Sequence, residues 1–221
     1  SISNVFKTDK EKVEGPSPLV ELAKPIAIKK LWSVSIGQGE GELGLRQKPF
    51  IDGDTLFAAD SANELVAIEK ATGKIKWQIN ANKDPNVGGW KFWENKTPTF
   101  ALTGGPSVYS GLLAIGSRNG EVMAFNALDG SLLWKKMVSS SVVAAPLVTS
   151  DTVVVRVNDG KVFGLDFATG EKKWQFDRGI PSLTVRGNSS PVLGPGFIFV
   201  GYEDGTLIAL NQNDGTRVWE Q

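Results

Sequence analysis

The hydrophobic pattern of this chain repeats four times as an apolar tetrad, then a turn glycine, then a tryptophan. The glycine comes eight residues after the start of each tetrad, and the tryptophan comes four residues after the glycine. The tetrads span residues 65–68, 122–125, 162–165 and 207–210, and the tryptophans are Trp77, Trp134, Trp174 and Trp219. Because each tetrad is apolar throughout rather than alternating, it is typical of a strand that is covered on both faces.

Each repeat predicts a four-stranded antiparallel meander. The glycine after the tetrad supplies the positive φ of a tight turn, so the tryptophan-bearing segment returns as a hairpin. Another apolar strand precedes each tetrad and joins it through the turns SANE, SRNG, VNDG and YEDG. These preceding strands are expected at residues 55–59, 112–116, 152–157 and 197–200. Residues 146–148 and 191–193 indicate a further strand in the last two repeats.

The spacing of the repeats is that of a β-propeller. Successive tryptophans lie 57, 40 and 45 residues apart, and a propeller blade takes about 40–45 residues. The third tetrad residue is small in every copy: Ala67, Ala124, Gly164 and Ala209. We expect the repeat tryptophan to occupy this space and to pack between neighbouring blades. The sequence therefore predicts an all-β fold, a β-propeller with about four four-stranded antiparallel blades.

We expect two parts in the chain, an extended N-terminal lead at residues 1–30 and a partial propeller at residues 31–221. The blades are expected at about residues 40–80, 98–138, 143–178 and 189–221. Trp32, in the stretch KKLWSVSIG, indicates a spare outermost strand at residues 31–36. Four blades and a spare strand lead us to expect further blades beyond Gln221. An open arc exposes apolar faces and strand edges, so we also expect the truncated propeller to self-associate.

Composition excludes several classes of function. The chain carries 24 basic and 24 acidic residues, so it has no net charge with which to attract nucleic acid. It contains no cysteine and no histidine, which removes disulfides, thiol nucleophiles, the usual zinc ligands and the commonest general base. No run approaches the roughly 18 apolar residues of a membrane-spanning helix. We assign no catalytic, cofactor-binding or metal-binding residue, and we expect no enzyme activity.

The stretch IPSLTVRG, residues 180–187, is unusual for a connecting loop. In an extended segment Leu183 and Val185 point the same way and form an apolar knob. Pro181 limits the backbone freedom that binding would remove, and Arg186 offers a planar set of donors. These residues either dock on a partner, or they plug the top of the propeller while Arg186 pairs with a neighbouring acid.

A second long connection, residues 82–96, holds the two tryptophans outside the repeat. Its aromatic residues Trp90, Phe92 and Trp93 either tuck under the blade edge or present an aromatic patch. We favour tucking, because apolar clusters under long loops are common.

The tetrad, the turn glycine and the tryptophan resemble the repeat of quinoprotein-type propellers. One branch of that superfamily is the dehydrogenases that bind pyrroloquinoline quinone and calcium in the central funnel, typically beneath a vicinal cysteine disulfide. The chain has no cysteine, which disfavours this branch. A fragment of such an enzyme is therefore the alternative and not the main interpretation.

A closer resemblance is to the BamB family, lipoproteins of the outer-membrane β-barrel assembly (BAM) machinery. It is carried by LWSVSIGQG at residues 31–39, by the aromatic insertion, and by IPSLTVRGNSSPV with GYEDGTLIALNQNDGTRVWEQ. The resemblance implies an eight-bladed ring, of which this chain would be the N-terminal half. It also implies a non-catalytic scaffold that aids insertion of outer-membrane proteins from the periplasmic face of the outer membrane.

The resemblance further implies partners and site residues. The family segment that matches IPSLTVRG binds the periplasmic POTRA domains of BamA, so the partner-binding residues would be Leu183, Val185 and Arg186. Val185 stands where a leucine is usual. Unfolded outer-membrane protein clients are further candidate partners. Membrane contact would come only through a lipid anchor on a cysteine before Ser1, and a second, acidic binding patch would lie beyond Gln221.

Overall fold

The computed structural model describes residues 24, 26–37, 47–82, 101–179 and 189–221. The chain divides into two units, Ser1–Lys30 and Leu31–Gln221. All the described strands belong to the second unit, which carries the candidate site.

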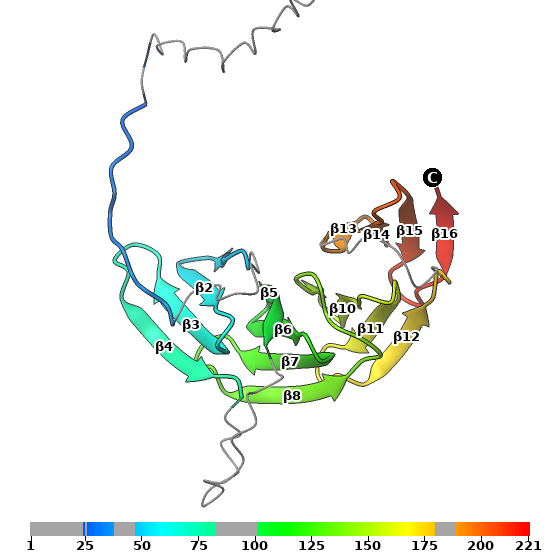
Figure 1. Cartoon of the computed structure of the whole chain (residues 1–221), viewed down its shortest axis with the longest axis horizontal. Coiled ribbons are helices and arrows are strands. Elements are labelled where there is room, and N and C mark those ends of the chain that lie inside the picture. The colour runs from blue at the N-terminus through cyan, green and yellow to red at the C-terminus, as the bar shows by residue number, and fades with distance from the viewer. Residues whose placement is uncertain (1–23, 25, 38–46, 83–100, 180–188) are drawn as a thin grey trace, which may run out of the picture. The chain divides into compact units, whose positions relative to one another are not determined.

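Leu31–Gln221 contains four antiparallel sheets of four strands, and the strands of each sheet follow chain order (Figure 1). The first sheet is β1 (Phe50–Asp52), β2 (Thr55–Ala59), β3 (Glu64–Glu69) and β4 (Ile75–Asn80), and the second is β5 (Leu102–Tyr109), β6 (Leu112–Ser117), β7 (Glu121–Asn126) and β8 (Leu132–Met137). The third is β9 (Leu147–Val148), β10 (Thr152–Arg156), β11 (Val162–Asp166) and β12 (Lys172–Phe176), and the fourth is β13 (Val192–Gly194), β14 (Phe197–Gly201), β15 (Leu207–Asn211) and β16 (Arg217–Glu220). The predicted all-β fold with four four-stranded blades is confirmed.

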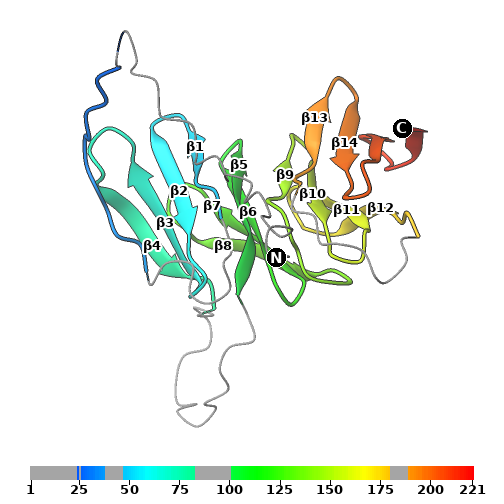
Figure 2. The same ribbon diagram turned by 45° about the horizontal axis from the view of Figure 1, so that its top comes forward.

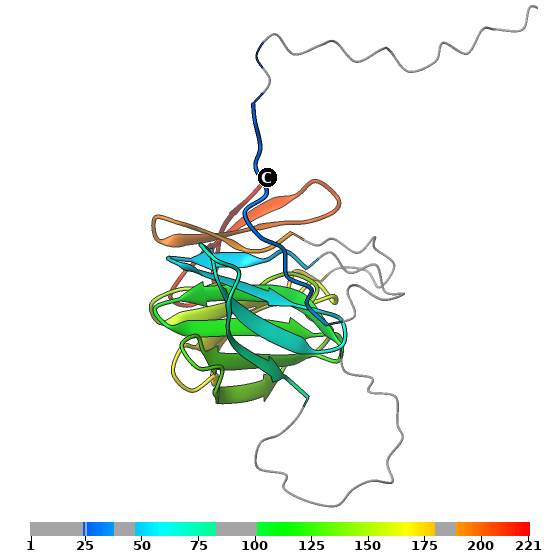
Figure 3. The same ribbon diagram turned by 90° about the vertical axis from the view of Figure 1, so that its left-hand side faces the viewer.

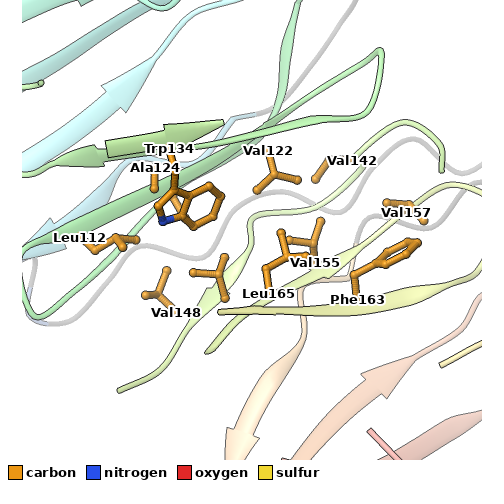
Figure 4. Close-up of a cluster of buried hydrophobic side chains, with 12 residues drawn as sticks. Leu112, Val122, Ala124, Trp134, Val142, Val148, Val155, Val157, Phe163 and Leu165 are labelled. Atoms are coloured by element: carbon orange, nitrogen blue, oxygen red, sulfur yellow. The ribbon is translucent and has the colours of Figure 1, made fainter. Parts of the chain in front are cut away.

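The apolar core lies between consecutive sheets rather than within one. One cluster joins β2 and β3 to β5–β7, a second joins β6 and β7 to β10 and β11, and a third joins β10 and β11 to β14 and β15. Figure 4 shows the second cluster, and Figures 2 and 3 show the sheets from two other sides. In β7, Val122 and Ala124 face the third sheet, whereas Met123 and Phe125 face the first. Burial on both faces explains why the tetrads are continuously apolar.

The repeat tryptophans form the joints between sheets. Each lies opposite the small tetrad residue of its own sheet, in the pairs Ala67–Trp77, Ala124–Trp134, Gly164–Trp174 and Ala209–Trp219. The first three of these rings also lie against the turn glycine of the next sheet, in the pairs Trp77–Gly130, Trp134–Gly170 and Trp174–Gly215. These contacts confirm the expected packing of the ring between neighbouring blades.

An indole hydrogen bond accompanies two of these joints. Nε1 of Trp77 donates to the carbonyl of Ala127 at 2.9 Å, and Nε1 of Trp134 donates to the carbonyl of Phe167 at 3.0 Å. Nε1 of Trp174 is buried and has no hydrogen-bond acceptor among the described residues. The joint between the third and fourth sheets therefore lacks a bond that the preceding joints have.

Residues 31–36 differ from the expected spare strand, because no described strand pairs with them. Trp32 nevertheless behaves as a repeat tryptophan. Its Nε1 donates to the carbonyl of Lys70 at 2.9 Å, and its ring lies against Gly73 of the first sheet. Together with Val34 and Ile36, it covers the first sheet on the side away from the second.

Candidate functional site

The predicted partner-binding residues Leu183, Val185 and Arg186 lie outside the described residues, as do Trp90, Phe92 and Trp93. The structure describes the residues that flank the IPSLTVRG segment on either side. β12 ends at Phe176 and is followed by residues 177–179, and the chain is described again from Ser189, just before β13.

Tyr202 is the centre of a group of side chains at these two ends, between the third and fourth sheets. Its ring is 6% exposed, and the guanidinium carbons of Arg156 and Arg178 each lie over it, 4.7 Å from its centroid. The Tyr202 hydroxyl donates to the carbonyl of Gly160 in the third sheet at 3.0 Å. We call Arg156, Arg178 and Tyr202 the Tyr202 cluster.

Arg156, the last residue of β10, connects the cluster to the C-terminal end of the segment. Its side chain is only 4% exposed. One terminal nitrogen donates to the Ser189 hydroxyl at 2.7 Å, and the other donates to Oε1 of Glu203 at 2.6 Å. A buried charge is costly unless it is paired, so Glu203 is needed for this burial. The Ser189 hydroxyl in turn donates to the carbonyl of Gly201 at 2.7 Å.

Arg178 connects the cluster to the N-terminal end of the segment. Its guanidinium donates to Oδ2 of Asp204 at 2.8 Å, to the hydroxyl of Thr206 at 2.7 Å and to Oε1 of Glu220 at 3.2 Å. These contacts reach both the YEDG turn and β16. Planar guanidinium groups suit such multiple acceptors better than a lysine ammonium would.

The Tyr202 cluster departs from the repeat. At the place of Arg156 the other sheets have Ala59, Gly116 and Gly201, and at the place of Tyr202 they have Asp60, Ser117 and Val157. At the place of Arg178, four residues after the tryptophan, the first two sheets have Ala81 and Val138. Sequence reasoning missed the cluster, although this departure from the repeat was a signal that could have found it.

Two pKa values reflect this environment. Burial raises the pKa of the Tyr202 hydroxyl to about 12, because removal from water disfavours the charged phenolate and the two nearby guanidinium groups offset this only in part. The backbone N–H and the hydroxyl of Thr206, and then the Arg178 guanidinium, lower the pKa of Asp204 to about 2. At neutral pH, Tyr202 therefore remains a donor and Asp204 remains an acceptor.

The raised pKa of Tyr202 gives a direct test of its burial. The chain has two tyrosines, so a Tyr109→Phe variant leaves Tyr202 as the one phenol that titrates at 295 nm. We expect a midpoint near pH 12 in the folded variant and near pH 10 in the same variant in urea. The linked stabilisation is present below pH 10 and is lost as the pH rises through about 12. A folded-state midpoint near 10 would contradict the buried placement.

Two features are absent from the described ranges. These ranges contain no group of three or more acidic side chains arranged to hold a metal ion. They also contain no helix of the length and apolarity that crossing a bilayer requires.

Comparisons with known proteins extend over most of the chain. Residues 29–89 and 84–221 match the model of the family described as outer membrane protein assembly factor BamB. A relative of that name from Xanthomonas campestris pv. campestris is 39% identical over 211 residues, which is 96% of this chain and 50% of the relative. The chain spans about half the length of the curated relatives it matches.

Solved structures agree on the fold. The crystal structure of BamB from Moraxella catarrhalis matches 80% of this chain and 48% of its own, with a TM-score of 0.65 and 27% identity. A europium-containing methanol dehydrogenase matches 86% of this chain and 43% of its own, with a TM-score of 0.61. At 18% identity, the second likeness concerns the fold alone.

Proposed function

This chain belongs to the family of the outer membrane protein assembly factor BamB, and on that premise we propose that it is a non-catalytic scaffold subunit of the BAM complex. In this role it aids the insertion of outer-membrane β-barrel proteins by presenting loops on a rigid frame, with no bond made or broken. The observation that carries the proposal is the family match, which runs from residue 29 to residue 221.

The proposed partner is BamA, through its periplasmic POTRA domains. Leu183 and Val185 supply an apolar knob, and Arg186 supplies donors for a carboxylate or a strand edge of the partner. The described surroundings support this assignment, because polar contacts hold Arg178 and Ser189, which flank the segment that contains these residues. Unfolded outer-membrane proteins are the proposed clients.

The proposed location is the periplasmic face of the bacterial outer membrane. The names of the relatives support an association with outer-membrane assembly. The finer part of the proposal, a lipid anchor on a cysteine upstream of Ser1, follows from the family resemblance.

A dehydrogenase-type enzyme fragment is the weaker alternative. Its support is a likeness of fold at 18% identity, and one propeller fold hosts many unrelated functions. The relatives at higher identity are named assembly factors, which supports a role without catalysis.

The test is binding of BamA periplasmic domains by the chain and by a Leu183→Ala, Val185→Ala, Arg186→Ala triple variant. We expect the triple variant to bind at least about tenfold more weakly, because it removes two branched side chains, each worth about 1.5–3 kcal/mol when fully buried, and an arginine, a residue enriched at interface hot spots. Binding is measured by surface plasmon resonance with the BamA domains immobilised.

A matched control replaces two exposed leucines and one base elsewhere, Leu128→Ala, Leu133→Ala and Lys172→Ala. This control should bind as the unmodified chain does. Equal affinity of the site variant and the unmodified chain would remove Leu183, Val185 and Arg186 from the interface.

A further inference from the structure

We propose that the Tyr202 cluster is a positioning element, which fixes the separation and direction of the two ends of the segment between Gly179 and Ser189. Only the expected effect of the cluster on partner binding rests on the proposed function. Its geometric part concerns Arg156, Arg178 and Tyr202 themselves and is tested without a partner.

The contacts reach both ends of the segment through one ring. Arg178 lies two residues before the segment begins, and Arg156 binds Ser189, which follows the segment. Both guanidinium groups lie over Tyr202 at 4.7 Å from its centroid. A displacement of either end therefore breaks a cation–π contact with the same ring as well as its own hydrogen bonds.

The Tyr202 cluster supplies polar contacts at the joint between the third and fourth sheets. Trp174 lacks the indole hydrogen bond that Trp77 and Trp134 make to the next sheet. The hydroxyl of Tyr202 bonds Gly160 across the same joint, and Arg156 of the third sheet bonds Glu203 of the fourth. The cluster thus links these two sheets at the end where the segment leaves and returns.

A residue that recurs in every sheet serves the geometry of the repeat, whereas the Tyr202 cluster occurs at this one joint in the described part of the chain. Holding the ends of a binding loop in place reduces the conformational entropy that docking removes. The cluster is therefore suited to pre-organising the loop that follows Arg178. Tyr202 and Arg156 are largely buried, so they act on a partner through the loop and not by contact.

The first experiment measures access to the segment in the 221-residue chain without any partner. Trypsin is specific for lysine and arginine, so cleavage after Arg186 reports on this segment, and cleavage after Lys91, between β4 and β5 in the sequence, serves as an internal reference. We expect Tyr202→Leu to raise the cleavage rate after Arg186 about tenfold, equivalent to about 1.4 kcal/mol, with no change after Lys91. Tyr202→Phe keeps the ring for both guanidinium groups but removes the hydroxyl bond to Gly160, so it should raise the rate less than Tyr202→Leu does.

Two further variants distinguish a local effect on the segment from general unfolding of the chain. Tyr109→Leu removes the exposed tyrosine elsewhere and should leave both cleavage rates unchanged. Arg178→Gln removes one guanidinium from a partly exposed position and should raise cleavage after Arg186 alone. An unchanged cleavage rate after Arg186 in both Tyr202→Leu and Arg178→Gln overturns the inference. An equal rise in cleavage after Arg186 and after Lys91 overturns it as well.

The second experiment separates this inference from the proposed partner. Tyr202→Leu, with Leu183, Val185 and Arg186 intact, should weaken binding of the BamA domains about tenfold, mainly by slowing association. Faster cleavage with unchanged binding would refute the role of the loop in docking but leave the positioning role in place. Unchanged cleavage with weakened binding would refute the positioning role.

Discussion

Replacing Trp134 with alanine is expected to lower the free energy of unfolding by about 3–5 kcal/mol. The side chain is 7% exposed, covers Ala124 in its own sheet and lies against Gly170 in the next. Its removal leaves a cavity in the core between the second and third sheets (Figure 4). It also leaves the carbonyl of Phe167 without its indole donor. Denaturant unfolding followed by circular dichroism measures the change.

Trp219 is the matched control for this prediction, because it occupies the same place in the fourth sheet. It is 40% exposed and has no turn glycine of a following sheet against it among the described residues. Trp219→Ala should therefore cost no more than about 1–2 kcal/mol. Equal costs at the two positions would show that the ring stabilises its own sheet and not the joint.

Gly170→Ala is expected to destabilise the chain by about 2–5 kcal/mol, from two separate causes. The backbone of Gly170 has a φ of +70°, which strains any residue with a Cβ. An added Cβ would also lie 2.6 Å from Cε3 of Trp134, so the ring would have to move. Thermal unfolding, with the shift converted at the midpoint, gives the total.

Gly111→Ala separates the two causes. Gly111 has a φ of +80°, and an added Cβ would meet nothing within 4 Å, so its cost of about 1–2 kcal/mol is backbone strain alone. The excess at Gly170 should shrink when Trp134 is also alanine, because the smaller side chain frees the space. Purely additive costs in that double variant would contradict the close approach of the ring.

The repeat could be predicted from sequence because apolar side chains bury both faces of the tetrad strands, which makes each tetrad continuously apolar. The first strands of the first two sheets, β1 and β5, were expected from the four-stranded repeat but were not assigned to particular residues. β5 contains Gly104, Gly105 and Pro106, residues that normally argue against a strand. The structure accommodates them because the ladder with β6 is irregular on either side of Gly104, and because Gly104 closely approaches the carbonyl of Ala144. Such an approach depends on the connection between β8 and β9, which is distant from Gly104 in the sequence.

The candidate site was only partly predictable. The sequence indicated a loop at residues 180–187, and its role stays a prediction. The turn YEDG was interpreted only as a hairpin, so Tyr202 was not singled out. Its importance comes from Arg156 and Arg178, which are 46 and 24 residues away along the chain. Periodicity carries no information about which side chains meet across two sheets. The one signal of this cluster in the sequence was its departure from the residue types of the repeat.

Trp32 sets the first sheet apart from the other three. Its indole lies beside Gly73 as the repeat tryptophans of the preceding sheets lie beside Gly130, Gly170 and Gly215. With Val34 and Ile36 it covers the face of the first sheet that points away from the second. Any further sheet that packed on this face by the geometry of the repeat would therefore have to displace residues 31–36 first.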